Sequence, residues 1–389
     1  MKKQQAKKSN RGKDPDALTL MMLCARSAGR CQFRGCNKVL FRDGITLEEF
    51  NNSNVAHIVA SSPDGPRGDV KRSHELSDKI SNLMLMCLDH HKLIDRKTKR
   101  FTEKVLLKMK AEQERSVENV CEALNCEPSH ILMLKSKIKD EQEVTISSEQ
   151  AVEAILPEKR PSVATPIMLD IEASGFYRDG TFWRDLENLL SRKFNAFVSS
   201  IVEMDRKVHF SVFPLAPIPL IIKLGYIMGD KIRADVFQKR RHPDTWKWSA
   251  KSSGSFFLEC RRPKPLRNGS GVALVFSLSA GISKEKQEGF AKFVGAKWIY
   301  ELCASEPSVD CISSKEDLYR FWHAYQQMME RIKQDHPRCK RISILAAVPV
   351  SAAFEIGRRY MPGVYPAIDV YDDYHAYFKA LEIGGRDDK

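Results

Sequence analysis

The chain has 389 residues, of which 42% are hydrophobic and 29% are charged. This length predicts two or three domains with well-packed cores. No apolar run is long enough to cross a bilayer, and the basic start lacks the apolar stretch of a secretory signal, so we expect a cytoplasmic protein without membrane contact. The net charge of +13 favours polyanionic partners, nucleic acid first.

The N-terminal segment is strongly basic. Its first 13 residues hold six Lys or Arg and no acid, which predicts a disordered tail over 1–16. Such a tail either contacts phosphates or is merely solvated. The ten cysteines are spread too thinly for a disulfide framework, so we expect some to be metal ligands and the others small buried residues.

The first half of the chain predicts a small domain over 17–126. A short helix (ALTLMMLCARSAG) leads into RCQFRGCNKVLF, a turn followed by a strand, and NVAHIVA at 54–60 is a second strand. The Pro-, Gly- and Ser-rich loop at 61–80 precedes SNLMLMCLDHHKLID, a strand or turn entering a helix. Helical spacing of apolar residues predicts a long helix at 102–124.

The second half predicts an α/β domain over 166–389, after a linker with one or two helices at 127–165. The predicted strands and helices alternate along the chain. We expect strands at 197–203, 207–213, 234–238, 272–279 and 342–350, and helices at 182–194, 217–229, 315–334 and 349–361. Two segments, starting FPLAPIPLIIKLGY and LAAVPVSAAFEIGRRY, share a strand, a proline turn, a helix and a strand with an Asp-Val pair, which indicates two related halves.

Two short-spaced pairs of metal-ligand residues stand far apart in the chain. Cys31 and Cys36 bracket a turn, and Cys87 and His90 form a Cys-x2-His pair. Four N/S ligands in this pattern are typical of a structural zinc site, which would staple a domain with a thin core. The alternative is a set of buried thiols.

His57, Asn82 and His91 follow one another in the order His-Asn-His. Residues 31–95 resemble an HNH endonuclease of the zinc-stapled ββα-metal type, through AHIVA, SNLMLMC and HHKLID. The resemblance implies that His57 activates water as the general base, that Asn82 orients the loop or the base, and that His91 binds a catalytic Mg²⁺ or Mn²⁺. It also implies that Cys31, Cys36, Cys87 and His90 bind Zn²⁺. This set suits phosphodiester hydrolysis, which needs an activated water and a Lewis acid.

One position departs from that family. Many HNH enzymes carry an aspartate ligand directly before the base, where this chain has Ala56. Asp69 and Asp95 are the candidates for a replacement oxygen ligand. Arg67 is either a contact to a DNA phosphate or an ordinary loop arginine.

Residues 165–385 resemble the SAVED domain, itself similar to two fused CARF-like Rossmannoid units. The matching segments are FPLAPIPLIIKLGYIMGD, DVFQKRRHPDTWKW and AAVPVSAAFEIGRRY with AIDVYDDY. An HNH domain followed by SAVED looks like an effector nuclease of CBASS antiphage systems. The resemblance implies that a cyclic dinucleotide from a partner nucleotidyltransferase binds SAVED, promotes a homo-oligomer (dimer to tetramer) and switches on degradation of double-stranded DNA with little sequence specificity. A cyclic trinucleotide is the other possible activator.

Candidate ligand-binding residues lie in the predicted α/β domain, most of them at or after the ends of predicted strands. Aromatic faces suit bases, cations suit phosphates, and loops before helix N-termini suit phosphates as well. The candidates are Trp246, Trp248 and Tyr177 for stacking, Lys239, Arg240 and Arg241 for phosphate, and Pro217, Pro349 and Ser351 in the loops after the strands. For each of them the alternative is ordinary packing.

Two other functions fit parts of the sequence. One is a constitutive, sequence-selective HNH restriction endonuclease, which would cleave without a small molecule. The other is a zinc-knuckle DNA-binding protein without enzymatic activity, in which His57→Ala would change nothing.

Overall fold

A computed structural model describes residues 10–123, 125–138, 145–252, 258–266 and 269–385, and the chain divides into two compact units at Asn125/Cys126. This division lies next to the predicted end of the first domain at 126. Among the described residues, no helix combines the length and apolar character needed to cross a membrane.

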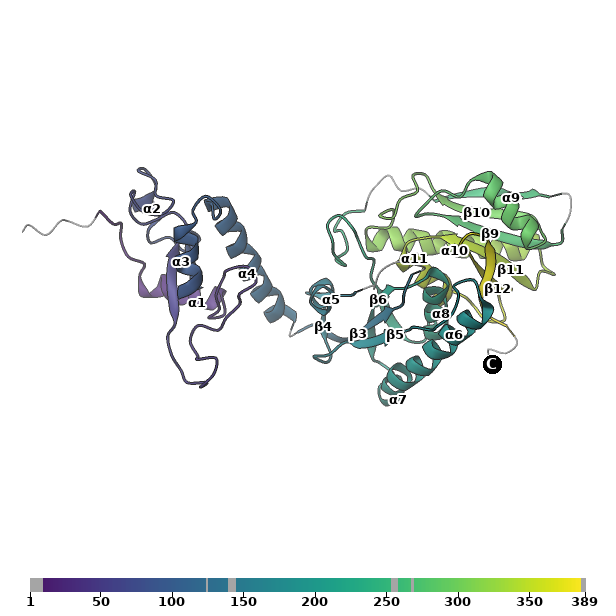
Figure 1. Cartoon of the computed structure of the whole chain (residues 1–389), viewed down its shortest axis with the longest axis horizontal. Coiled ribbons are helices and arrows are strands. Elements are labelled where there is room, and N and C mark those ends of the chain that lie inside the picture. Colours follow the sequence, from purple (N-terminus) through teal and green to yellow (C-terminus); the bar gives the residue numbers. More distant parts are fainter. Residues whose placement is uncertain (1–9, 124, 139–144, 253–257, 267–268, 386–389) are drawn as a thin grey trace, which may run out of the picture. The chain divides into compact units, whose positions relative to one another are not determined.

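The N-terminal unit is built around an antiparallel hairpin with a helix packed on it (Figure 1). The hairpin pairs β1 with β2 in a register that sets His57 opposite Leu83. Every residue of β2 is buried, because this strand is covered by helices of the unit. The elements are α1 (Ala17–Arg26), β1 (Ser53–His57), α2 (Ser73–Leu76), the 3-10 turn η1 (Ile80–Asn82), β2 (Leu83–Cys87), α3 (Leu88–Arg96) and α4 (Glu103–Ala123).

The predicted disordered tail is partly wrong. Residues 1–9 lie outside the described part of the chain, but residues 10–16 are placed against the unit. The amide of Gly12 donates to the carbonyl of Ser61 at 2.8 Å, and Asp16 caps α1 by accepting from the amide of Thr19 at 2.7 Å. Backbone pairing and an N-cap fix this segment, which composition alone does not reveal.

The C-terminal unit contains two sheets with mostly parallel strands. The first sheet has the order β4-β3-β6-β7, with β5 also paired to β3, and all of its pairs are parallel. Its strands are β3 (Glu127–Lys135), β4 (Lys159–Pro161), β5 (Ile167–Asp170), β6 (His209–Leu215) and β7 (Arg233–Val236).

The second sheet has the order β13-β12-β11-β9-β10-β8. Its four central strands are parallel, and the edge strands β13 and β8 are antiparallel to their neighbours. Its strands are β8 (Leu258–Pro265), β9 (Gly271–Ser277), β10 (Ala296–Ala304), β11 (Arg341–Ala347), β12 (Ala367–Asp373) and β13 (Tyr377–Ile383). Parallel pairs joined through helices make both sheets Rossmann-like, as the sequence predicts.

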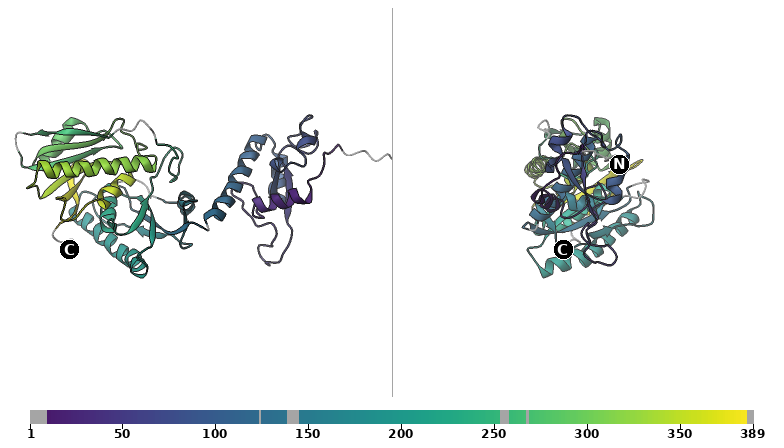
Figure 2. Two further views of the ribbon diagram at one scale, coloured as in Figure 1. Left: turned by 180° about the vertical axis from the view of Figure 1, so that it is seen from behind. Right: turned by 90° about the vertical axis from the view of Figure 1, so that its left-hand side faces the viewer.

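One large core joins the two sheets. Alternate residues of each sheet enter this core, such as Leu132 and Leu134 of β3 and Leu274 and Phe276 of β9. The other face of each sheet carries a smaller cluster, under α5 for the first sheet and under α9 for the second. Figure 1 and Figure 2 show α9 and α10 on opposite sides of β9 and β10. The helices are α5 (Ser148–Ile155), α6 (Gly180–Phe194), α7 (Ser200–Met204), α8 (Ile218–Met228), α9 (Lys284–Phe293), α10 (Lys315–Asp335) and α11 (Val350–Arg358).

The predicted internal echo is confirmed. Strand β6, Pro217, α8 and β7 repeat as β11, Pro349, α11 and β12, and each pair of strands is parallel. The two helices cross with almost no space between their backbones. A Cβ on Gly225 would overlap the carbonyl oxygen of Phe354, and a Cβ on Gly357 would overlap that of Ile222.

The structure differs from the sequence-based prediction in two segments of the C-terminal unit. The predicted linker at 127–165 instead supplies β3, α5 and β4, and β3 lies inside the first sheet. The strand predicted at 197–203 is helical, because α6 continues through a π-turn (Asn195–Ser199) into α7. The helical spacing of buried Leu190, Phe194 and Val198 outweighs the β-branched composition of this stretch.

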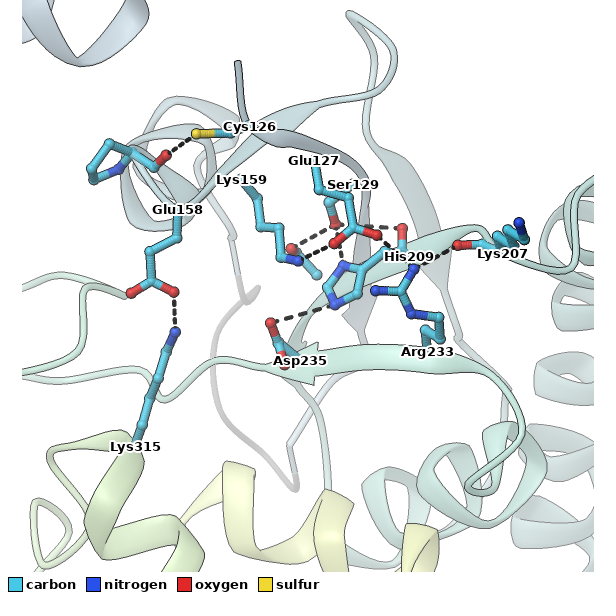
Figure 3. Close-up of polar contacts among 12 residues, drawn as sticks. Cys126, Glu127, Ser129, Glu158, Lys159, Lys207, His209, Arg233, Asp235 and Lys315 are labelled. Atoms are coloured by element: carbon cyan, nitrogen blue, oxygen red, sulfur yellow. Dashed lines mark hydrogen bonds and ion pairs between the residues drawn. The ribbon is translucent and has the colours of Figure 1, made fainter. Parts of the chain in front are cut away.

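A polar network ties together the amino ends of the first sheet (Figure 3). Glu127 accepts from both Arg233 and Lys159 at 2.5 Å, and these two cations lower the pKa of its carboxyl to about 2. The ring of His209 lies between Ser129 Oγ at 2.9 Å from Nδ1 and Asp235 Oδ2 at 3.4 Å from Nε2. Because this network lies at the amino ends of the strands, it does not occupy their carboxyl ends, where open α/β sheets bind ligands.

Candidate functional site

The four predicted zinc ligands come together in the N-terminal unit. The ligand atoms of Cys31, Cys36, Cys87 and His90 all lie within 4.8 Å of one another. The Sγ atoms of Cys31 and Cys87 are 3.8 Å apart, and His90 Nδ1 is 3.1 Å from Cys87 Sγ. Zinc–sulfur bonds of about 2.3 Å in a tetrahedron give an S···S edge of about 3.8 Å, so the donors fit a tetrahedral metal.

The chain folds locally to present these donors. Cys87 ends β2 and caps α3, so His90 follows one turn later on the same side. The ring of Phe33 stacks on His90 with centroids 4.0 Å apart, which fixes the plane of the imidazole. Burial raises the pKa of the Cys31 thiol to about 12, so a bound cation is what would favour its thiolate here.

His57 ends β1 beside the loop that Asn82 holds. The ring nitrogen Nε2 lies 3.0 Å from the carbonyl of Ser77. Asn82 is buried and exchanges two hydrogen bonds of 2.8 Å with the backbone of Val59. Asn82 therefore fixes the loop that follows His57 and does not touch the ring through any described contact, which agrees with an orienting role.

His91 projects from α3 next to Asp95. His91 Nε2 is 3.4 Å from Asp95 Oδ2, and both side chains are about one-third exposed. Arg67 donates to Asp95 at 2.9 Å and also to the carbonyls of Ile58 and Ile94, each at 2.7 Å. The Arg67 side chain is only 7% exposed and joins the end of β1 to α3, which favours the structural role over the contact to DNA that the sequence also left open.

The other carboxylate candidate has different partners. Asp69 Oδ1 accepts from the amides of Lys71 and Arg72, both at 2.9 Å, and these hydrogen bonds lower the pKa of Asp69. Asp69 thus supports the turn before α2, and no described contact brings it to His57 or His91. Between the two candidates, only Asp95 lies beside His91. Ala56 is buried within β1, so an acid at that position would need desolvation.

A cavity of about 490 Å³ opens in the C-terminal unit at the carboxyl ends of both parallel sheets. This is where open α/β sheets bind ligands. Tyr177, Pro217, Lys239, Arg241 and Pro349, which the sequence singled out, all line it. The two prolines begin α8 and α11, so both helix N-termini face this space.

The cavity also holds residues that the sequence did not predict. Lys286 and Asp373 line it and pair at 3.2 Å, and Asp372 accepts from the hydroxyl of Tyr177 at 2.8 Å. Burial and the Asp372 charge raise the pKa of Tyr177 far above its usual range. Aligning the two echoing segments is the signal that would have found the acids, because DVFQK and DVYDD occupy equivalent strand ends.

Ser351 lies behind the cavity wall. Its hydroxyl donates to Gln238 Oε1 at 2.7 Å, and its amide donates to the same oxygen at 3.1 Å. Gln238, at the end of β7, therefore caps α11 of the other half. Ser351 itself is fully buried, positions the wall and does not line the cavity, so a direct contact of Ser351 with a ligand stays a prediction.

The predicted stacking tryptophans are placed elsewhere. Trp246 is 1% exposed and packs edge-on against Phe213 under the first sheet. Trp248 packs against the same cluster, and neither ring lines the cavity. Arg240 pairs through its backbone with Thr245 and does not line the cavity either. The packing alternative holds for both tryptophans.

Comparison with known proteins identifies part of the chain. Residues 190–383 match the family described as "SMODS-associated and fused to various effectors sensor domain". The C-terminal unit carries a SAVED domain. The match starts within α6, and β3, which lies upstream of the matched residues, pairs with β6 in the first sheet.

Solved structures similar to this chain include SAVED/CARF-domain containing Cap4 receptors. That of Acinetobacter baumannii with the cyclic trinucleotide 2'3'3'-cAAA is 12% identical, with a TM-score of 0.42 over 76% of this chain and 60% of that one. That of Moraxella osloensis is 10% identical, with a TM-score of 0.37 over 81% and 60%. The chain thus spans about 60% of the length of these receptors. No curated protein matches the chain.

Proposed function

We propose that this chain is a metal-dependent DNA endonuclease of the HNH type, activated by a cyclic oligonucleotide that binds its SAVED domain, and that it acts in CBASS antiphage defence. The observation that carries the proposal is the ordered set His57, Asn82 and His91 on a hairpin and helix, in a chain whose other unit is a SAVED sensor domain.

The sensing side is supported by the chemistry of the cavity. Lys239, Arg241 and Lys286 supply positive charge, and the N-termini of α8 and α11 supply backbone dipoles. The carbon-rich walls from Ile218, Val309 and similar residues suit the faces of bases. A ligand with more than one phosphate and more than one base uses both kinds of surface, and both halves of the domain contact it.

The catalytic side is supported by the hydrogen bonding of His57. A carbonyl oxygen only accepts, so Nε2 of the neutral ring must carry its hydrogen toward Ser77, and Nδ1 keeps a free lone pair. Burial lowers the pKa of His57, which keeps the ring neutral near pH 7. Nδ1 is then able to take a proton from an attacking water.

The two metals have separate residues. The first site would hold Zn²⁺ through Cys31, Cys36, Cys87 and His90, and it would join the turn at 31–36 to the start of α3. His91 Nε2 and Asp95 Oδ2, 3.4 Å apart, are close to the edge of about 3 Å between adjacent ligands of an octahedral ion, so they fit Mg²⁺ or Mn²⁺. When bound, that ion supplies Lewis-acid stabilisation of the phosphate. Arg67 holds the Asp95 carboxylate in place through its hydrogen bond of 2.9 Å.

The ligand acts as a switch only if it binds one state more tightly than the other. We infer that the cyclic oligonucleotide stabilises an oligomer in which nuclease sites meet both strands of a duplex. Contacts of cations with the DNA backbone carry little sequence information, so discrete fragments are not expected.

The test is plasmid cleavage by the purified full chain in Mg²⁺, with and without a panel of cyclic di- and trinucleotides, beside His57→Ala. Cleavage that needs one ligand and is lost in the variant is the expected result. Cleavage without any ligand would indicate a constitutive restriction-type nuclease. DNA binding without cleavage under every condition would indicate a zinc-knuckle DNA-binding protein.

A further inference from the structure

Residues 10–14, which we call the N-terminal arm, lie on the loop that follows β1. Gly12 donates its amide to Ser61, and Arg11 Nε lies 3.3 Å from Ser61 Oγ. His74 Nε2 is 3.3 Å from the carbonyl of Asn10. The arm therefore contacts the chain both before Arg67, at Ser61, and after it, at His74.

The arm reaches the candidate nuclease site through Ser77. Gly12 packs so closely on Ser77 that a Cβ on this glycine would overlap the serine hydroxyl. The carbonyl of the same Ser77 is the partner of His57 Nε2 at 3.0 Å. After burial and the Ser77 hydrogen bond, the charges of Arg11 and Asp14 are the next influences on the pKa of His57, so the arm lies within electrostatic reach of the base.

The side chain of Arg11 is exposed and held at one end only. Its Nε contacts Ser61, while its two terminal amino groups have no partner among the described residues. Lys13 is also exposed, and its ion pair with Asp78 is long, with 4.0 Å between Lys13 Nζ and Asp78 Oδ2. A guanidinium that is fixed through Nε, with two free amino groups beside the candidate nuclease site, is suited to bind a phosphate in a bidentate manner.

We propose that the N-terminal arm is part of the DNA-binding surface of the nuclease site, and that Arg11 contacts a backbone phosphate next to the phosphodiester bond that is attacked by the water that His57 activates. This inference rests on the proposed function, since it names how that site holds its substrate. The rival is a strap that blocks the site. The charge of the arm favours the substrate contact, because a cationic segment attracts the polyanion that the site must accept.

The test compares Arg11→Ala with Arg26→Ala in the full chain. Arg26 is also an exposed arginine and lies at the far end of α1, about 15 Å along the helix from the arm. Binding of a short fluorescein-labelled DNA duplex is followed by anisotropy across a salt series, with Ca²⁺ replacing Mg²⁺ to prevent cleavage, and cleavage is then measured in Mg²⁺ with the activating nucleotide.

One phosphate contact changes the logarithm of the DNA association constant by about 0.9 for each tenfold change in salt concentration. Between about 1 M and about 0.1 M salt this is about eightfold, so Arg11→Ala should weaken DNA binding about eightfold at about 0.1 M salt. The slope of log K against log salt should fall by about 1. Arg11→Lys should keep the slope, and Gly12→Ala should weaken binding by displacing the arm. Arg26→Ala should match the wild type.

Three outcomes would overturn the inference or separate it from the proposed function. Equal binding by Arg11→Ala and Arg26→Ala, with the wild type cleaving normally, overturns the inference alone. Faster cleavage by Arg11→Ala also overturns it and establishes the strap. Loss of binding in Arg11→Ala from a wild type that never cleaves supports the arm as a DNA contact and overturns the nuclease.

Discussion

Replacing Arg67 should unfold the N-terminal unit at much lower denaturant without touching the SAVED unit. Arg67→Ala removes donors from the carbonyls of Ile58 and Ile94 and from the Asp95 carboxylate. A buried acceptor left without a donor costs about 1–3 kcal/mol, and the partly exposed Asp95 recovers some hydration, so the loss should be about 3–5 kcal/mol.

The backbone at this residue sharpens the prediction. Arg67 has φ of 59°, a left-handed conformation that a Cβ disfavours. Arg67→Gly loses the same hydrogen bonds but relieves that strain, so it should be more stable than Arg67→Ala by about 1 kcal/mol. Comparing these two variants thus separates the free energy lost with the hydrogen bonds from the free energy of the left-handed backbone conformation.

The chain offers a clean assay for this variant. All five tryptophans lie in the C-terminal unit, the first of them at position 183. Tryptophan emission therefore follows unfolding of the SAVED unit only, while far-UV circular dichroism follows both units. In urea, the dichroism transition of the variant should shift and the emission transition should not. Unchanged dichroism together with weaker DNA binding would refute the reasoning and return Arg67 to a role as a phosphate contact.

The remaining predictions concern the metals, the base, the ligand and the packing. Cys36→Ser should lower bound zinc, measured by mass spectrometry, from about one per chain to nearly none, and a wild type without zinc would contradict the site. The cleavage rate should rise with pH, with a midpoint below the ordinary histidine pKa, because burial lowers the pKa of His57 and the neutral base persists to lower pH. The stability that His57 contributes should be fully present above the pKa of histidine in the unfolded chain. It should be lost as the pH falls through the lowered pKa of His57 in the folded chain. Lys239→Ala should weaken cyclic nucleotide binding by about tenfold in calorimetry, the loss expected for one charge-assisted hydrogen bond, and an unchanged affinity would exclude this cavity. Gly357→Ala should destabilise the SAVED unit by about 3 kcal/mol, whereas Gly289→Ala, whose Cβ would find ordinary space within α9, should be neutral or stabilising by up to about 1 kcal/mol.

Sequence reasoning succeeded where chemistry and spacing coincide. The Cys31–Cys36 pair and the Cys87–His90 pair converge as predicted, and the repeated strand, proline and helix give two parallel crossovers. It failed at β3, where Ile131 to Leu134 are all buried. A strand covered on both faces shows no alternation, and its charged and polar flanks resemble those of a linker.

The lining of the cavity in the C-terminal unit was only partly predictable, for a physical reason. Lys239 and Arg241 were identified because cations follow a strand, and they do line the cavity. Trp246 has the same sequence surroundings but turns into the core beside Phe213. The side of the turn that the Trp246 ring occupies depends on packing against α5, a contact between distant segments that the neighbouring sequence does not determine.

The glycine seam between α8 and α11 separates what this protein can vary from what it cannot. Gly225 and Gly357 each face backbone of the opposite helix, so no change at one position makes room for a side chain at the other. The cavity rim, in contrast, is made of side chains at strand ends that can be exchanged one at a time. Single substitutions at the rim can therefore change the shape and charge of the cavity during evolution, while the two glycines that hold α8 against α11 must be kept.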